Sequence, residues 1–498
     1  MSIPSAEVVS TEHSVATKDA PHWLSRETCR LHAETLVRWG VPLLAFALVK
    51  LTSRPAQVTA QGWQTTAVFA ATMVAFALRP LPPAVVVLGA LTVLAGSGAG
   101  GPERALAGYA APGVWLVVAA MILSRALRDS GLARRVALHF VRRLGTTSPR
   151  LAGALVLSDA LLAAFVPSVT ARNAGIVLPI GVGLAEFYES RPGPSAGRLG
   201  AFLVLTLYQG SSVVCAMFLT GQASNVLAAS IAARELGVAM SWSSWFIAAL
   251  VPALVSGVAI IAVVQALARP SVRATPQAVE FAAQKLAVLG RMKREEVLTL
   301  TVTLASCLLF ASSRFHHLEP VAIALLTAVA LLGVGAVPWA AVLADKTLWD
   351  VFVWYGGLFS LAQAVASSGT PAALASRVSS ALDGTPPLLA FVLASGVAYL
   401  AHYLFASITA QVLTMFLPLV LVLIHTGVPP ALACYGMIFA FNLSAGLTHY
   451  GATNGPVLFA ADYVSARTWW RVGFVVGALN LVVWLSVGLV WWRVLGLW

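Results

Sequence analysis

The sequence predicts an all-α polytopic membrane protein with inverted repeats, two re-entrant hairpins and broken helices. Of its 498 residues, 59% are hydrophobic and 10% are charged, a composition far too apolar for a soluble domain. Apolar runs long enough to cross a bilayer recur along the chain, enough for roughly ten to twelve spans and hairpin arms. Two similar segments, Pro-Ser-Val-Thr-Ala (167–171) and Ala-Ser-Ile-Thr-Ala (406–410), interrupt such runs 239 positions apart. These interruptions indicate two copies of one membrane unit.

The same offset relates other residues and guides the division of the chain. It links Trp115 to Trp354 and Pro179 to Pro418. The first 38 residues are polar and lack the apolar segment of a secretory signal, which is typical of a cytoplasmic tail. We therefore expect four parts: a cytoplasmic N-terminal tail (1–38), a first repeat (39–268), a cytoplasmic linker (269–294) and a second repeat (295–498).

The distribution of basic residues predicts that the two repeats have opposite orientations. Seven arginines fall within 125–150, whereas the matching window 364–389 contains only Arg377. Because basic loops stay on the cytoplasmic side of a membrane, the first window is expected there and the second on the periplasmic side. The net charge of +12 lies mainly beside membrane segments, so its expected partners are anionic lipid headgroups and not nucleic acid.

Each repeat is expected to contain one hairpin and one broken helix. A chain break at mid-membrane depth is tolerated only where it is buried in protein or lines a cavity, so four such breaks are expected to converge on one polar pocket. An amphipathic helix that lies in the membrane interface is also predicted at 132–143. The expected elements are the hairpins 150–187 and 389–426 and the broken helices 200–236 and 430–463.

The breaks have the chemistry of an anion site. A broken helix presents unpaired backbone N–H groups at the start of its second part, where the helix dipole is positive. Hydroxyl groups of Ser and Thr add donors without adding charge. Two such tips that face each other would hold a molecule with a carboxylate at each end. The alternative is that the hydroxyls only cap helices in a packed bundle.

Several polar side chains near the breaks allow more than one interpretation. Arg172 would be costly in a membrane unless it meets an anionic substrate, a cavity or an acid, and Asp159 is a candidate partner. Asn225 and Asn454 either contact a ligand or satisfy broken backbone. His402 and His449 are candidates for proton transfer or for structural hydrogen bonds.

No motif for catalysis, nucleotide binding or metal binding is present in the sequence. The protein is therefore expected to have no enzymatic activity and no cofactor. Broken apolar segments at matching places in two halves are typical of secondary transporters. An anion channel and a membrane-embedded enzyme are the alternative classes.

These segments resemble the divalent anion/sodium symporter (DASS) family, particularly its citrate/succinate and 2-oxoglutarate/malate exchanger branch. The resemblance covers nearly all of 39–498, and its most specific parts are PSVTARNAGIVLPI (167–180), AMFLTGQASN (216–225), HYLFASITAQ (402–411) and LSAGLTHYGATNGPVLFAADYV (443–464). It implies a homodimer whose transport domain carries both hairpins across the membrane in an elevator motion. The family's paired Ser-Asn-Thr signatures, which bind carboxylates, map onto 168–170 and 407–409.

The chain departs from the family pattern at two positions. Val169 stands where the first signature has Asn, and Gln411 stands where the exchanger branch has His, whereas Arg172 matches the first basic position of that branch. The expected substrate-binding residues are Ser168, Val169, Thr170, Arg172, Asn225, Ser407, Ile408, Thr409, Gln411, Thr453 and Asn454.

The resemblance implies transport of C4–C6 di- or tricarboxylates, such as succinate, malate, 2-oxoglutarate or citrate, across a bacterial inner membrane. Antiport of one anion for another is favoured because Arg172 would repel a nearby sodium ion. The alternative is a sodium- or proton-coupled symporter. Its sodium sites would lie near Ser168, Asn225, Thr409 and Asn454.

Overall fold

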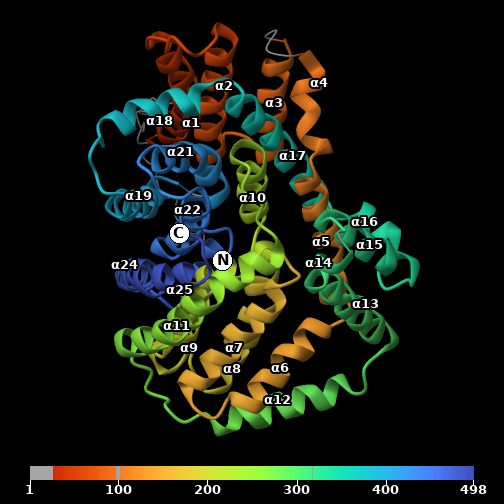
Figure 1. The fold of residues 1–498 in the computed structure, drawn as a ribbon. Coiled ribbons are helices and arrows are strands. Elements are labelled where there is room, and N and C mark those ends of the chain that lie inside the picture. The colour runs from red at the N-terminus through yellow and green to blue at the C-terminus, as the bar shows by residue number, and fades with distance from the viewer. Residues whose placement is uncertain (1–25, 97–100, 317, 406) are drawn as a thin grey trace, which may run out of the picture.

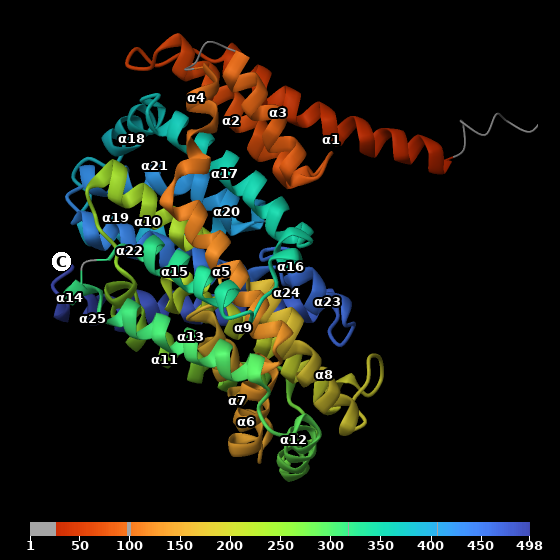
Figure 2. The same cartoon turned by 90° about the vertical axis from the view of Figure 1, so that its right-hand side faces the viewer.

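The fold is an assembly of helices (Figures 1 and 2), as the sequence predicts. The computed structural model describes residues 26–96, 101–316, 318–405 and 407–498. Outside the helices, the described part of the chain forms one isolated β-bridge, between Thr147 and Ala274.

The first half and the linker contain the following helices: α1 (Arg26–Leu51), α2 (Ala60–Leu78), α3 (Pro83–Gly96), α4 (Gly101–Leu106), η2 (Ala107–Ala110), α5 (Pro112–Asp129), α6 (Leu132–Leu144), α7 (Ser148–Ala163), η3 (Thr170–Val177), α8 (Leu178–Phe187), η4 (Ala196–Arg198), α9 (Gly200–Met217), η5 (Leu219–Gly221), α10 (Ala223–Leu236), α11 (Trp242–Ala268) and α12 (Pro276–Leu289).

The second half contains α13 (Arg294–Ala311), α14 (Ser313–His316), α15 (Pro320–Gly333), α16 (Trp339–Leu343), α17 (Lys346–Ala366), α18 (Thr370–Ser380), α19 (Pro387–Ala401), η6 (His402–Leu404), α20 (Ile408–Gln411), η7 (Val412–Phe416), α21 (Leu417–His425), α22 (Pro430–Ser444), η8 (Ala445–Leu447), α23 (Gly455–Ala460), α24 (Ala466–Val483), η9 (Trp484–Gly488) and α25 (Leu489–Val494).

The two hairpins have matching boundaries. Their first arms, α7 and α19, begin 239 residues apart, as do their second arms, α8 and α21. Pro179 and Pro418 are each the second residue of a second arm. Each lies directly after a π-helical segment, η3 or η7, at a point where the continuous helix lacks one backbone donor. Both views place α7, α8 and α12 toward the lower end of the molecule and α18 and α21 toward the upper end (Figures 1 and 2). The hairpins therefore come from opposite ends of the fold.

Several described helices are long and apolar enough to cross a membrane. Six qualify by length and composition, and the number rises to eight if the bent pairs α4/η2–α5 and α17–α18 each count as one span. The sequence count of ten to twelve is higher because it includes short hairpin arms and helices such as α3 and α15, each 14 residues long. The chain is thus a multi-pass membrane protein.

Two expected polar segments contain helices. Residues 1–25 of the predicted tail lie outside the described residues, and α1 begins at Arg26, inside that tail. The predicted linker contains α12, which packs against α6. The amphipathic stretch 132–143 coincides with α6, whose buried face packs on both α7 and α12. The linker is therefore ordered, and through α6 it supports the first hairpin.

An ion pair joins α6 to the start of α13. Arg135 donates from Nε to Glu296 Oε1 at 2.8 Å and from Nη2 to Oε2 at 2.9 Å. The backbone N–H of Lys293 donates to Glu296 Oε2 at 2.9 Å. The hydrogen bonds from Arg135, the largest influence, and from Lys293 lower the pKa of Glu296, although its burial opposes the shift. The pair fixes α6 to the second half.

We predict that Glu296→Gln destabilises the protein by about 3–5 kcal/mol, because it leaves the buried guanidinium of Arg135 without a counter-charge. Since the folded-state pKa of Glu296 is lowered, the stabilisation is full above the ordinary carboxyl pKa and falls as the pH drops through the folded value. Thermal unfolding of detergent-purified protein measures both effects. The matched control is Glu295→Gln, because Glu295 is exposed, and an equal loss in both variants would contradict this role.

Candidate functional site

The two hairpin tips have the same local structure. Each is followed by a wide π-helical segment, η3 or η7, a feature that is frequent at functional sites. In both tips the central side chain is buried, Val169 at 7% exposure and Ile408 at 5%. The flanking hydroxyl residues are only partly buried. These are Ser168 and Thr170 in the first tip and Ser407 and Thr409 in the second.

Each tip lies against the broken helix of the opposite repeat. In the first tip, Thr170 Oγ1 donates to Thr453 Oγ1 at 2.8 Å, which connects this tip to the break before α23. The second tip begins α20, which contacts α10, the helix that follows the first break. Each tip thus contacts a broken helix of the other repeat.

Arg172 is the central residue of the first tip. Its side chain is fully buried, and its Nε lies 2.9 Å from Asp159 Oδ1 of the first hairpin arm. Its Nη1 donates to the carbonyls of Val166 at 2.8 Å and Gly221 at 2.6 Å. Its Nη2 lies 3.1 Å from Cys215 Sγ. Asp159, the acid that the sequence suggests as a partner, is paired with this arginine.

A chain of amides extends this ion pair into the second repeat. Asn173 Nδ2 donates to Asp159 Oδ2 at 3.2 Å. Asn454 Nδ2 donates to Asn173 Oδ1 and to Ser211 Oγ, both at 3.1 Å. Asn454 Oδ1 is buried without a hydrogen-bond partner among the described residues, as is Thr448 Oγ1. These two oxygens are free to accept a donor or to approach a cation.

A second group of amides joins the first break to α22. Asn225 Nδ2 donates to the carbonyls of Cys215 at 2.8 Å and Phe218 at 2.9 Å, where the helix is interrupted. Asn225 Oδ1 accepts from Asn442 Nδ2 at 2.9 Å, and Gln222 donates to Asn442 Oδ1. Asn225 therefore donates to the carbonyls left unpaired by the break and connects this break to the second repeat.

The second hairpin contains a related network of neutral groups. Gln411, which matches Arg172 in the repeat, donates from Nε2 to the carbonyl of Ala398 at 2.5 Å. Ala398 matches Asp159 by the same offset. Gln411 Oε1 lies 2.7 Å from His402 Nδ1, and His402 Nε2 lies 2.9 Å from the carbonyl of Gly451. Gln411 and His402 together connect tip to break, as Arg172 does alone in the first repeat.

Glycine is required at both breaks for these contacts. A Cβ at Gly221 would lie 2.5 Å from the carbonyl oxygen of Cys215, and one at Gly451 would lie 2.6 Å from His402 Nε2. Both distances are far below an ordinary carbon contact. A side chain at Gly221 would therefore distort the broken helix itself, and one at Gly451 would push that break away from the second hairpin.

Sequence reasoning missed four polar residues of these networks: Asn173, Ser211, Gln222 and Asn442. Asn173 and Gln222 lie inside the quoted motifs, and Asn442 is an amide within an apolar helix, which was the available signal. His449 is not part of the His402 network. Its Nδ1 accepts from Trp470 Nε1 at 3.1 Å, and its ring stacks on Phe459.

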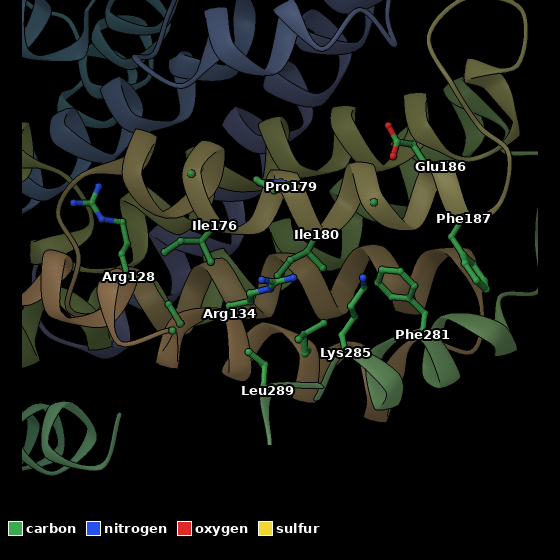
Figure 3. Close-up of a pocket in the computed structure, with 15 residues that line it drawn as sticks. Arg128, Arg134, Ile176, Pro179, Ile180, Glu186, Phe187, Phe281, Lys285 and Leu289 are labelled. Atoms are coloured by element: carbon green, nitrogen blue, oxygen red, sulfur yellow. The ribbon is translucent and has the colours of Figure 1, made fainter. Parts of the chain in front are cut away.

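A cavity of about 910 Å³ lies outside these networks, between α6, the second arm of the first hairpin and α12 (Figure 3). Its apolar lining includes Ile176, Ile180 and Phe281. The basic side chains Arg128, Arg134 and Lys285 lie among these, with Lys285 Nζ over the ring of Phe281 and Glu186 near one end. The cavity combines a surface for hydrocarbon with positive charge.

Paired hairpins, crossed breaks and a polar centre within apolar helices define a membrane transporter of the broken-helix class. The chain matches the family model described as "Sodium:sulfate symporter transmembrane region" over residues 33–498. It therefore belongs to this family, which confirms the resemblance found in the sequence. The family consists of transporters, so the protein is not an enzyme.

Curated relatives align with nearly the whole chain. The "Putative malate transporter YflS" of Bacillus subtilis is 34% identical over 463 residues, which cover 92% of this chain and 97% of the relative. The "Citrate/succinate antiporter" of Escherichia coli is 29% identical and covers 92% and 97%. The crystal structure of the YdaH transporter from Alcanivorax borkumensis has a TM-score of 0.54 at 15% identity, with 94% and 98% covered. This last likeness supports the fold alone.

We predict that Asp159→Asn lowers the free energy of unfolding by about 3–5 kcal/mol, because Arg172 loses the only acid paired with it in the described structure. Thermal unfolding in detergent measures the loss. Asp462→Asn is the matched control, since Asp462 is exposed and its positive φ of 56° suits Asn. An Asp159→Asn protein as stable as the control would show that the ion pair does not hold the tip.

Proposed function

We propose that this transporter carries C4–C6 di- or tricarboxylates, with one carboxylate held at each hairpin tip. The main support is the pair of half-buried hydroxyl sets, Ser168 with Thr170 and Ser407 with Thr409, each at the start of a helix. The printed names of the relatives, a malate transporter and a citrate/succinate antiporter, agree with this substrate class.

Arg172 is not assigned a direct contact with the substrate in this proposal. Asp159 already neutralises the guanidinium, and all three of its nitrogens have partners. Arg172 then acts as a positioning residue that fixes the first tip to Gly221. The carboxylates meet hydroxyl and backbone N–H donors, which form hydrogen bonds without requiring a buried charge.

Exchange of one anion for another is the favoured mode. In the described spans, the buried acid Asp159 is paired with Arg172, so it is not free to hold a cation. The bacterial antiporter among the relatives supports the same mode. The second candidate is sodium-coupled symport, which the unpartnered oxygens of Asn454 and Thr448 favour. Neutral oxygens of this kind are ordinary ligands of hard cations.

The proposal also includes the motion, the oligomeric state and the membrane location of the protein. The hairpins and breaks move together as the transport domain of an elevator, and two protomers form a homodimer. The bacterial relatives support a bacterial inner membrane as its location. The basic and apolar side chains that line the cavity in Figure 3 suit anionic lipids. Native mass spectrometry of purified protein tests the dimer and the bound lipids.

Uptake into proteoliposomes tests the substrate and the coupling. Labelled succinate, malate, 2-oxoglutarate and citrate are offered to vesicles that are empty or preloaded with unlabelled anion, each with and without a sodium gradient. We expect uptake that requires preloading and ignores sodium. Uptake into empty vesicles that follows the sodium gradient would support symport, and no uptake of any of the four acids would refute the substrate class.

We predict that Thr170→Val and Thr409→Val each weaken binding of the transported anion by roughly 10-fold or more, because each removes a hydroxyl that the proposal assigns to a carboxylate and keeps the side-chain shape. In the structure the Thr170 hydroxyl donates to Thr453 instead, so it turns to the carboxylate only when the anion binds. Competition by unlabelled anion in the exchange assay measures the change. Thr426→Val, at the far end of the second hairpin arm, is the control, because its hydroxyl donates to Leu423 within the helix. Equal affinity in all three variants would contradict the assignment of the tips.

A further inference from the structure

The contacts of His402 specify which of its ring nitrogens carry hydrogen. The carbonyl oxygen of Gly451 accepts only, so His402 Nε2, 2.9 Å away, must donate to it. The carbonyl of Ala398 also accepts only, so the Gln411 atom that contacts it must be the amide nitrogen. Gln411 then presents its oxygen to His402 Nδ1 at 2.7 Å. With Gln411 in this orientation, all three contacts are complete only when both ring nitrogens carry hydrogen, which is the imidazolium form.

Turning the Gln411 amide over does not remove this requirement without cost. The reversed amide would put its oxygen 2.5 Å from the carbonyl oxygen of Ala398, where two acceptors repel each other. The Ala398 carbonyl would also lose a donor at a helix end, because the N–H of His402 points to Tyr399 and Leu400 instead. A neutral His402 thus breaks one of the three contacts that join the second hairpin to its break.

Burial works against the charged ring when the site is empty. His402 is fully buried, and it forms no ion pair among the described residues, which makes an isolated imidazolium costly. The titratable groups on the elements around it are Tyr399, Tyr403, Cys434, Tyr435, His449 and Tyr450, together with Arg467 and Arg471 on the exposed side of α24 and Arg234 and Glu235 in the exposed last turn of α10. The one acid among them, Glu235, is exposed and forms no ion pair with His402, so the proposal takes the counter-charge from outside the protein.

A bound carboxylate would supply this counter-charge. Gln411 is the last residue of α20, whose first turn follows Ser407 at the second tip. An anion at that tip lies at the same short helix that contacts His402 through Gln411. We propose that His402 binds a proton when an anion occupies the second tip, so that anion binding and proton binding are coupled there. This inference rests on the proposed function, because it requires an anion at the tip.

The two repeats then differ in the kind of charge that they hold. In the first, Arg172 is permanently charged and permanently paired with Asp159. In the second, Ala398 replaces the acid, and the titratable His402 replaces the fixed cation. The positive charge of the second repeat is therefore present only together with a substrate.

Calorimetric titration of the purified full-length protein with malate tests the proposal. The titrations are made between about pH 7 and pH 8.5, where malate is fully ionised. Repeating them in buffers that differ in ionisation enthalpy gives the number of protons taken up per anion bound. We expect the wild type to take up protons and to bind malate up to about 10-fold more tightly for each unit of falling pH. His402→Asn should bind malate with no proton uptake and no pH dependence.

Two further variants serve as a control and as a second test of the His402 contact. His425→Asn is the matched control, because His425 is exposed and bonds within its own helix, and it should retain the wild-type proton uptake. Gln411→Leu leaves His402 in place but removes the acceptor of its Nδ1 proton, and it should reduce the uptake even if His402→Asn fails to fold. Malate binding without proton uptake in the wild type, or unchanged uptake in His402→Asn and Gln411→Leu, would overturn the proposal. Absence of malate binding together with absence of carboxylate exchange in vesicles would instead refute the proposed substrate class.

Discussion

The structure depends on the need to satisfy polar groups that are buried within apolar helices. Four breaks expose backbone groups at a depth where water is scarce, and each unsatisfied group would cost several kcal/mol. The buried pair of Arg172 and Asp159 meets this need in the first repeat by reaching the carbonyls of Val166 and Gly221. Without it, neither the tip nor the break has a fixed position.

Side chains of each repeat form hydrogen bonds with the broken helices or hairpin of the other repeat. Asn454 of the second repeat bonds to Asn173 of the first, while Asn442 bonds to Asn225. Tyr208 likewise directs its hydroxyl to the carbonyls of Ala445 and Thr448. Because these contacts cross between the halves, the hairpins and breaks form one polar unit. Such a unit is suited to move as a body, which is the property that an elevator mechanism requires.

Different polar groups of the site have different roles. Amides and the ion pair hold the backbone, whereas the hydroxyl groups of the tips remain partly accessible for a ligand. A neutral, well-bonded framework with accessible hydroxyl groups can bind an anion without a large desolvation cost. The exception is the second repeat, where His402 and Gln411 stand in place of a permanent charge.

The sequence by itself determined the all-helical membrane class, the repeat offset and the positions of the breaks, because hydropathy and glycine-containing interruptions are local properties of the chain. The first arms α7 and α19 and the second arms α8 and α21 begin at the offset of 239 residues that relates Pro179 to Pro418. Only the tertiary structure decided that Arg172 pairs with Asp159, that Asn442 and Gln222 belong to the polar centre, and that Gln411 acts through His402. Those contacts join residues as far apart as Gln222 and Asn442, and one sequence contains no signal for which distant donor meets which acceptor. The helix starts at Arg26 and at Pro276 were also missed, since packing against neighbouring helices overrides the polarity of those segments.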